Sequence, residues 1–228
     1  YMSEARQLGL TVKPPNVNRS DESFTLEQPN PTSDLRPPAS LWMGLGQVRE
    51  LTRTTMKTIM AQRLFESLED FLARAQPQYV EAVNLVQVGA LDGLGNAKAM
   101  LSQLERDRWH GRHTGQMGLL ATQPVIAMPD PTLHERAAWE REVLGMLVSV
   151  HPLQLVAEDP AQHGLIRSDE LSRRAGQDVT LAGVQLAAHR FSAQQAPMLL
   201  VDMEDEAGIY QVLWSGAALD HYRSALSQ

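Results

Sequence analysis

The turn at residues 89–95 holds the residues best suited to bind an anion. Gly93 and Gly95 allow the backbone to approach a ligand closely. Asn96 can cap the following helix, whose first backbone amides favour a negative charge, and Lys98 adds a positive charge to its first turn. The pattern predicts contact with phosphate groups, such as those of DNA, without reading of the bases. The alternative is a tight turn between two helices that needs glycine only for its geometry.

A second cluster lies within residues 109–131, a stretch rich in Gly, His and Pro that is predicted to be a loop. Gln116, Met117, Leu119 and Leu120 place apolar side chains and a glutamine in this polar surrounding. A short apolar segment in a loop is typical of a peptide that docks in the pocket of a partner. Packing of the segment on its own domain explains the pattern equally well.

The C-terminal part contains residue types that stack on or clamp single-stranded bases in oligonucleotide-binding barrels. These residues are Arg190, Phe191, Trp214 and Tyr222. Aromatic residues on strands also form cores, so a purely structural role is the alternative.

Potential metal ligands occur in two places, and neither predicts a metal site. Asp202 and the run 204–206 lie beside a glycine turn and are predicted to form a solvated hairpin end. His110 and His113 lie in a loop without a third ligand. The sequence also lacks a nucleophile elbow, a phosphate-binding loop and a dinucleotide fingerprint, so no catalytic residue is predicted.

Composition narrows the class of protein. The chain has 228 residues, no cysteine and a net charge of −7, which excludes a disulfide framework, an iron–sulfur cluster and a thiolate zinc site. The absence of cysteine also favours a cytoplasmic protein. No apolar run approaches the length of a membrane span and no signal-peptide pattern opens the chain, so we expect no membrane partner. The charge is uneven: residues 36–113 carry ten basic and eight acidic side chains, whereas residues 114–228 carry seven and fourteen. The acidic total argues against a free-standing nucleic-acid binder.

The periodicity of apolar residues predicts the elements that position these clusters. Three- and four-residue spacing predicts helices over 56–64, 68–72, 79–88, 96–104 and 133–150, and a helix ending at Gly9. Prolines predict a loop over 28–40, and alternation predicts strands over 179–184, 198–203 and 208–214. We therefore expect an α+β fold, with a mostly helical region followed by a partial oligonucleotide-binding barrel.

The order of these pieces resembles the C-terminal portion of bacterial DNA polymerase III alpha subunits. The likeness is carried by the segments 1–24, 41–48, 65–74, 89–95 and 140–153, and by the strands from Val179 onward. In the family, the corresponding pieces are the end of the fingers region, a helix-hairpin-helix region and an oligonucleotide-binding fold. Transferred to this chain, the resemblance implies fingers and linker over 1–40, helix-hairpin-helix over 41–113, a clamp-binding loop and connecting helix over 114–177, and a partial barrel over 178–228.

The resemblance also implies roles for the clusters. Gly93, Gly95, Asn96 and Lys98 become contacts to primer–template DNA, and Arg190 and Phe191 become contacts to the single-stranded template. The segment Gln116–Leu120 matches in place and pattern the peptide with which family members bind the sliding clamp, although Leu120 replaces the usual aromatic residue. Other replisome subunits are further expected partners.

Three departures from the family pattern limit these roles. The first hairpin normally turns through Gly-Val-Gly, but here the stretch is Glu50-Leu51-Thr52, which cannot offer DNA the same close approach to its backbone. Asn16 replaces an aspartate of the family. The aspartates of the palm, which bind two metal ions for nucleotidyl transfer, are absent, so Mg²⁺ is expected only in a full polymerase and not in this segment.

We therefore interpret the chain as a DNA-binding and clamp-tethering portion of such a polymerase, inactive in synthesis by itself. The alternative is a stand-alone degenerate paralogue that acts as a protein-interaction scaffold in a repair or replication complex. The altered first hairpin and the acidic charge favour this alternative.

Overall fold

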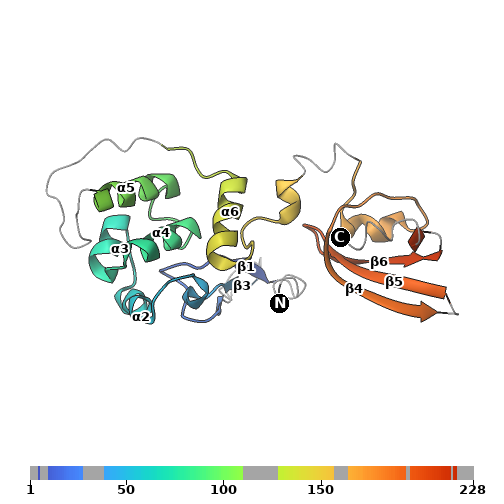
Figure 1. Ribbon diagram of the computed structural model, residues 1–228, viewed down its shortest axis with the longest axis horizontal. Helices are drawn as coiled ribbons and strands as arrows, with labels where there is room; N and C mark the ends of the chain where they lie inside the picture. Colours follow the sequence, from blue (N-terminus) through green and yellow to red (C-terminus); the bar gives the residue numbers. More distant parts are fainter. Residues whose placement is uncertain are drawn as a thin grey trace, which may run out of the picture. The chain divides into compact units, whose positions relative to one another are not determined.

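The computed structural model describes residue 5 and residues 10–27, 39–109, 128–156, 164–193, 196–216 and 218–219. The chain divides into two compact units, one of residues 9–150 and one of residues 151–228 with residues 1–8 (Figure 1). Each unit is described by itself. The four-part division drawn from the resemblance stays a prediction.

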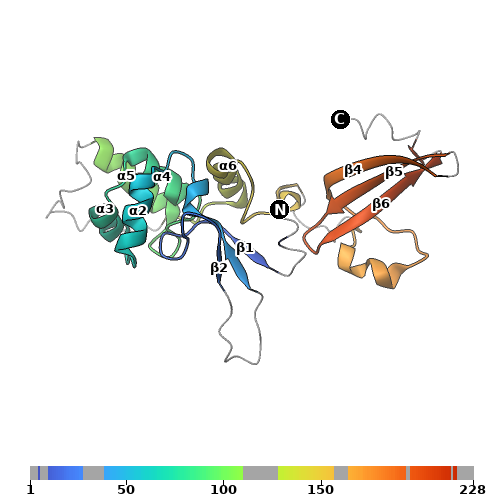
Figure 2. The ribbon, with the colours of Figure 1, turned by 90° about the horizontal axis from the view of Figure 1, so that it is seen from below.

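The first unit contains a small mixed sheet in the order β1-β3-β2 (Figure 2). Its strands are β1 (Thr11–Lys13), β2 (Thr25–Glu27) and β3 (Ser40–Trp42). β1 runs parallel to β3, and β2 runs antiparallel to it. The register sets Lys13 beside Trp42, with the ammonium 4.8 Å from the ring centroid, and the indole N–H donates to Glu27 at 2.7 Å.

This unit also contains six helices among the described residues, and the five longer ones lie at or near the ranges that the spacing of apolar residues predicts. They are η1 (Leu45–Gln47), α2 (Arg53–Gln62), α3 (Leu68–Ala75), α4 (Tyr79–Gln87), α5 (Ala97–Trp109) and α6 (Leu133–Leu144). Polar N-caps begin several of them: the side chains of Thr52, Ser67 and Thr132 each accept the backbone amide three residues on. Helix α2 ends earlier than predicted, at Gln62. Leu64, which was expected on its apolar face, is exposed.

The core lies among these helices and includes Met43, the residue that follows β3. Its largest fully buried apolar side chains include Met43, Leu45, Ile59, Phe71, Leu85 and Leu91. Phe65 and Phe71 pack edge to face with their ring centroids 5.2 Å apart. Val17 and Val150 are also fully buried, so the core of this unit joins residues from its first turns to its last.

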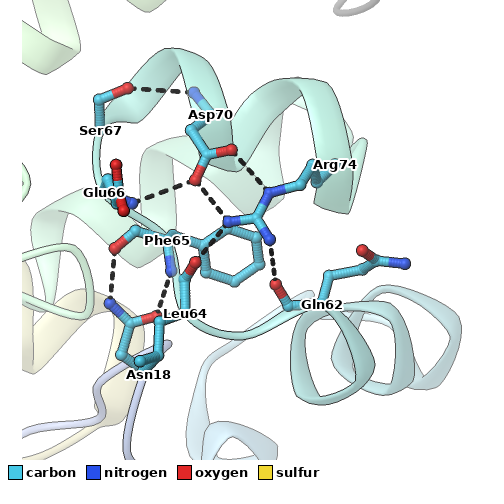
Figure 3. Close-up of polar contacts among 8 residues, drawn as sticks. All are labelled: Asn18, Gln62, Leu64, Phe65, Glu66, Ser67, Asp70 and Arg74. Atoms are coloured by element: carbon cyan, nitrogen blue, oxygen red, sulfur yellow. Dashed lines mark hydrogen bonds and ion pairs between the residues drawn. The ribbon is translucent and has the colours of Figure 1, made fainter.

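Arg74 on α3 holds the linker between α2 and α3 (Figure 3). Its guanidinium lies 4.6 Å from the Phe65 ring centroid, pairs with Asp70, and donates to the backbone carbonyls of Gln62 and Leu64. Asn18 accepts the amide of Phe65 at 2.8 Å and donates to its carbonyl at 2.9 Å. These contacts tie the start of α3 to the N-terminal segment.

The prediction of a helix from Leu133 to Val150 is wrong at its C-terminal end. Helix α6 stops at Leu144 because Gly145 adopts a left-handed conformation with φ of 72°. The carboxylate of Glu140, which is fully buried, then accepts the backbone amides of Val148 and Ser149. This side chain replaces helical carbonyls as the acceptor, so the chain after Gly145 turns away from the helix.

The second unit contains an antiparallel sheet in the order β4-β5-β6 (Figure 1). Its strands are β4 (Val184–Ala193), β5 (Ala196–Glu204) and β6 (Ile209–Ser215), and the short helices η2 (Pro152–Leu155) and η4 (Ser168–Arg174) precede them. The two later strands lie where predicted, but the predicted strand over 179–184 is wrong. The strand begins only at Val184. Gly183, just before it, lies against Tyr210: a Cβ there would come within 2.4 Å of the Tyr210 hydroxyl.

The sequence analysis predicted a solvated end for the acidic β5–β6 hairpin, and this is wrong for Asp205. Asp205 is buried and accepts the amides of Ser168, Ala207 and Gly208 and the Ser168 hydroxyl. Burial raises the pKa of Asp205, but these hydrogen bonds outweigh it and leave the pKa below its usual value. Asp205 therefore acts as a structural acceptor that fixes the start of η4 to the turn. The fold is α+β, a helical region followed by a three-stranded antiparallel sheet, as the sequence predicts.

Candidate nucleic-acid interface

The second hairpin, residues 88–96, joins α4 to α5 and contains the predicted phosphate contacts. Gly89 and Gly93 have φ of 76° and 96°, a region that glycine enters without strain. The turn is closed by backbone hydrogen bonds from Ala90 to Leu85 and from Asp92 to Gly89. A Cβ at Gly93 would meet nothing within 4 Å, so this backbone faces open space. The hairpin thus exposes a glycine backbone, as the phosphate prediction requires.

Asn96 caps α5 as predicted, and its side chain also donates two hydrogen bonds to the segment before α6. Its Oδ1 accepts the amide of Ala99 at 3.1 Å, while its Nδ2 donates to the carbonyl of Met128 and to Asp130. Both termini of the side-chain amide are therefore used within the protein. Asn96 fastens the start of α5 to the segment that leads into α6.

Lys98 is paired inside the protein. Its Nζ lies 2.8 Å from Glu135 on the first turn of α6, and its side chain is 25% exposed. Hydrogen bonds from Lys98 and from Thr132 lower the pKa of Glu135 to about 2. On the same helix Arg136 pairs with Asp92 at 3.0 Å. The N-terminal turn of α6 therefore neutralises the cation that the sequence assigned to a phosphate.

The first hairpin, residues 48–52, joins η1 to α2 without glycine. Glu50 occupies the left-handed region with φ of 62°, which is uncommon for a residue with a side chain. The backbone of Arg49 is held on both sides: its amide donates to Val143 at 3.2 Å, and its carbonyl accepts from Asn84 at 2.8 Å. A glutamate thus occupies the left-handed position of this turn, and neighbouring elements hold the backbone beside it.

Glu81 is a structural residue of this hairpin that the sequence did not single out. It is 1% exposed and accepts the amides of Thr52 and Gln78 and the Thr55 hydroxyl at 2.7–2.8 Å. Burial raises the pKa of Glu81, but these hydrogen bonds outweigh it, and the pKa lies below its usual value. The capping-box spacing of Gln78 and Glu81 was a signal that could have indicated the residue. One carboxylate thereby joins the N-termini of α2 and α4.

Two of the predicted single-strand contacts in the second unit, Arg190 and Phe191, do not come together. Arg190 lies opposite Leu199, and Phe191 lies opposite Met198. Because successive strand residues point to opposite faces of a sheet, these two side chains lie on different faces. Arg190 shares its face with the buried Leu199 and with Trp214, whereas Phe191 is 44% exposed on the other face.

Several predicted features fall outside the described residues. These are the clamp segment, with Gln116, Met117, Leu119 and Leu120, and the residues His110, His113 and Tyr222. Among the residues that the structure describes, no cluster of three or more potential ligands forms a metal site. None of the helices in the described ranges is long and apolar enough to cross a membrane.

A pair of helical hairpins, each with a residue of positive φ in its turn, is the architecture of a helix-hairpin-helix protein. Residues 9–101 match the family model of the helix-hairpin-helix motif, which supports DNA binding. The chain is 30% identical to an error-prone DNA polymerase of Symbiobacterium thermophilum, in an alignment that covers 90% of the chain. It is 32% identical over 67% of its length to the DNA polymerase III subunit alpha of Thermus aquaticus, and 25% identical over its whole length to that of Vibrio cholerae.

The chain is therefore a relative of the bacterial DNA polymerase III alpha subunits and error-prone DNA polymerases, which confirms the resemblance found in the sequence. It spans only 13–23% of the length of these three relatives. What it matches is thus one segment of a much longer polymerase.

Proposed function

We propose that this chain is the part of a DNA polymerase III alpha-type polymerase that holds primer–template DNA. The observation that carries the proposal is the pair of hairpins within a helix-hairpin-helix match, the second with an open glycine backbone at Gly93. Backbone amides in such a turn bind phosphates of any sequence, which is the recognition that a polymerase needs as it moves along DNA. Gly95, Asn96 and Lys98 complete this proposed contact, and Lys98 must exchange its Glu135 partner for a phosphate.

Binding of a primer–template duplex across a salt series tests the proposal. We expect fluorescence anisotropy to detect weak binding at about 50 mM salt that is lost steeply toward 200 mM, since each phosphate contact releases a counterion. The double variant Arg173→Ala/Arg174→Ala loses positive charge in the second unit, outside both hairpins. It is compared with the native chain as the control for a general loss of positive charge. Absence of duplex binding at low salt contradicts the proposal.

A sliding clamp is the second proposed partner. Gln116, Met117, Leu119 and Leu120 have the composition of a docking peptide, and a tether of this kind converts repeated rebinding of DNA into an intramolecular event. Capture of the chain by an immobilised clamp should fail when Gln116 and Leu119 are both replaced by Ala. Replacement of Gln123 and Gln103 by Ala is the control, and unchanged capture by the first variant contradicts the docking role.

The sheet of the second unit is proposed as a partial oligonucleotide-binding fold that approaches the single-stranded template. Phe191 offers an exposed aromatic ring, and Arg190 offers a cation on the other face. Base stacking on an aromatic side chain contributes about 1–3 kcal/mol per base. Phe191→Ala should therefore weaken binding of a short oligothymidine more than Arg190→Ala does, and equal binding by all three proteins removes this role.

The acidic surroundings of the second hairpin support one other candidate, an interaction scaffold that has lost DNA contact. The pairing of Lys98 with Glu135 and of Arg136 with Asp92 is the specific observation in its favour. The salt series separates the two candidates, because a scaffold binds neither duplex nor single strand at low salt.

A further inference from the structure

Three cations surround the first hairpin, on the side where the sequence no longer provides a glycine turn. Arg49 lies in the turn, with its side chain 66% exposed, and Arg53 and Lys57 are exposed on the first two turns of α2. Residues four apart lie on one face of a helix, so Arg53 and Lys57 are neighbours on the surface. We call this set, Arg49, Arg53 and Lys57, the cationic stripe.

The stripe is presented by a rigid backbone. Arg49 is fixed through its amide and carbonyl to Val143 and Asn84, and the amide of Thr52 is fixed to the buried Glu81. A fixed backbone lowers the entropic cost of aligning charged side chains with a ligand. The side chains remain long enough to reach phosphates that lie beside the hairpin rather than in direct contact with its backbone.

The charge of the stripe is only weakly opposed. The first turn of α2 contains no acidic residue, and neither Arg53 nor Lys57 forms an ion pair with any residue that the structure describes. Arg49 pairs with Glu50, whose carboxylate lies 4.0 Å from the Arg49 guanidinium. At the second hairpin, by contrast, Lys98 has a partner at 2.8 Å. The first hairpin is therefore the more positive of the two.

We propose that the first hairpin binds the phosphate backbone of duplex DNA through the side chains of the cationic stripe, with Glu50 weakening that contact. This proposal rests on the proposed function, because it assigns the DNA contact of the same module to a different set of atoms. Side-chain cations replace the backbone amides that a Gly-Val-Gly turn would offer. Exposed charges act by displacing counterions from DNA, so their contribution falls as salt rises.

Anisotropy measurements with a primer–template duplex test the stripe against the second hairpin. Arg53→Ala/Lys57→Ala should lower affinity about tenfold at low salt and reduce the salt slope by about two, because each lost phosphate contact removes roughly 0.9 from the slope. Lys98→Ala should lower affinity less than threefold, since its charge is already paired. Arg106→Ala/Arg141→Ala removes the same net charge from exposed positions of the same unit and is the matched control.

Glu50 supplies a test in the opposite direction. Glu50→Gln should raise duplex affinity by roughly threefold, because the charge beside Arg49 is removed while the side chain keeps its size. Far-ultraviolet circular dichroism and thermal unfolding check that each variant is folded, which is expected at exposed positions.

The outcomes distinguish the stripe from the proposed function. If the native chain binds duplex DNA but Arg53→Ala/Lys57→Ala matches its control in affinity and slope, the stripe is not the contact and the proposed function stands. A larger loss from Lys98→Ala than from the stripe variant overturns the stripe in the same way. Failure of the native chain to bind at low salt overturns both.

Discussion

The two hairpins of residues 9–150 turn through different kinds of residue. The second hairpin turns through Gly89 and Gly93, and the cation beside it is paired with α6. The first hairpin turns through Glu50, and the cations beside it are exposed. Just before the first hairpin, Gly44 is closely packed: a Cβ there would come within 2.4 Å of the Glu22 carbonyl.

The comparison teaches that turn geometry and ligand contact are separate properties. A left-handed residue in a turn costs about 1–2 kcal/mol when it carries a side chain, and contacts around the turn can supply this amount. Glu81 and α6 hold the first hairpin, so its shape does not depend on glycine in the turn. In our proposal, its contact with phosphate is made by the side chains of the cationic stripe.

Gly44→Ala has the largest expected effect and tests whether the first hairpin depends on close backbone packing. The new Cβ would lie 2.4–2.8 Å from backbone atoms of Glu22 and Ser23, which cannot move as a flexible side chain does. We expect a loss of about 3 kcal/mol in the free energy of unfolding by urea. Gly95→Ala, where the Cβ meets only the Met100 side chain at 3.6 Å, is the control. Equal losses at the two glycines would remove this distinction.

Glu81→Ala tests whether one buried carboxylate holds the first hairpin in place. The variant leaves the amides of Thr52 and Gln78 and the Thr55 hydroxyl without their acceptor, so we expect a loss of about 2–3 kcal/mol. Glu81→Gln keeps one oxygen acceptor and should lose about half as much. Hydrogen exchange of the Thr52 amide should accelerate in both variants, and an unchanged rate would show that Glu81 does not hold the turn.

Gly89→Ala and Gly93→Ala break the second hairpin in two different ways. Both place a side chain at positive φ, which costs about 1 kcal/mol or more. Only the Cβ at Gly89 also comes within 2.8 Å of the Asp92 and Arg136 side chains, so this variant should lose about 2 kcal/mol. Thermal unfolding of the two variants measures the difference. A larger loss at Gly93 would contradict the geometry of the turn.

Glu135→Gln has the smallest expected effect and tests the pairing of Lys98. The pKa of Glu135 in the folded chain is about 2, below the ordinary value of 4.5, so its contribution to stability is complete above pH 4.5 and is lost as the pH falls toward 2. The variant should lose this part of the pH dependence of unfolding, and Lys98→Met should reduce it. Released Lys98 should also strengthen duplex binding by roughly threefold. Identical pH profiles for Glu135→Gln and the native chain would contradict the pairing.

Much of the helical unit could be predicted from the sequence because the signals are local. Buried residues at three- and four-residue spacing, such as Leu68, Phe71 and Leu72, indicate a helix through their own neighbours, and Asn96 indicates the start of α5. Strand β4 gave a weaker signal, since most of its side chains are exposed and no alternation marks its start at Val184. The end of α6 was missed because Gly145 had to be weighed against the apolar residues that follow it.

At the candidate site, the sequence predicted the residue types but not their partners. Sequence by itself determined which residue types gather at each hairpin, the order of the longer helices and of the last two strands, and the relation to the polymerases. Only the tertiary structure decided which cations are neutralised, because Lys98 pairs with Glu135, 37 residues away. It also decided how the first hairpin is held, because the amide of Thr52 donates to Glu81, 29 residues away. It also separated Arg190 from Phe191, which are adjacent in sequence but lie on opposite faces of a sheet. Charge and register are set by contacts between distant residues, and a pattern of near neighbours does not contain them.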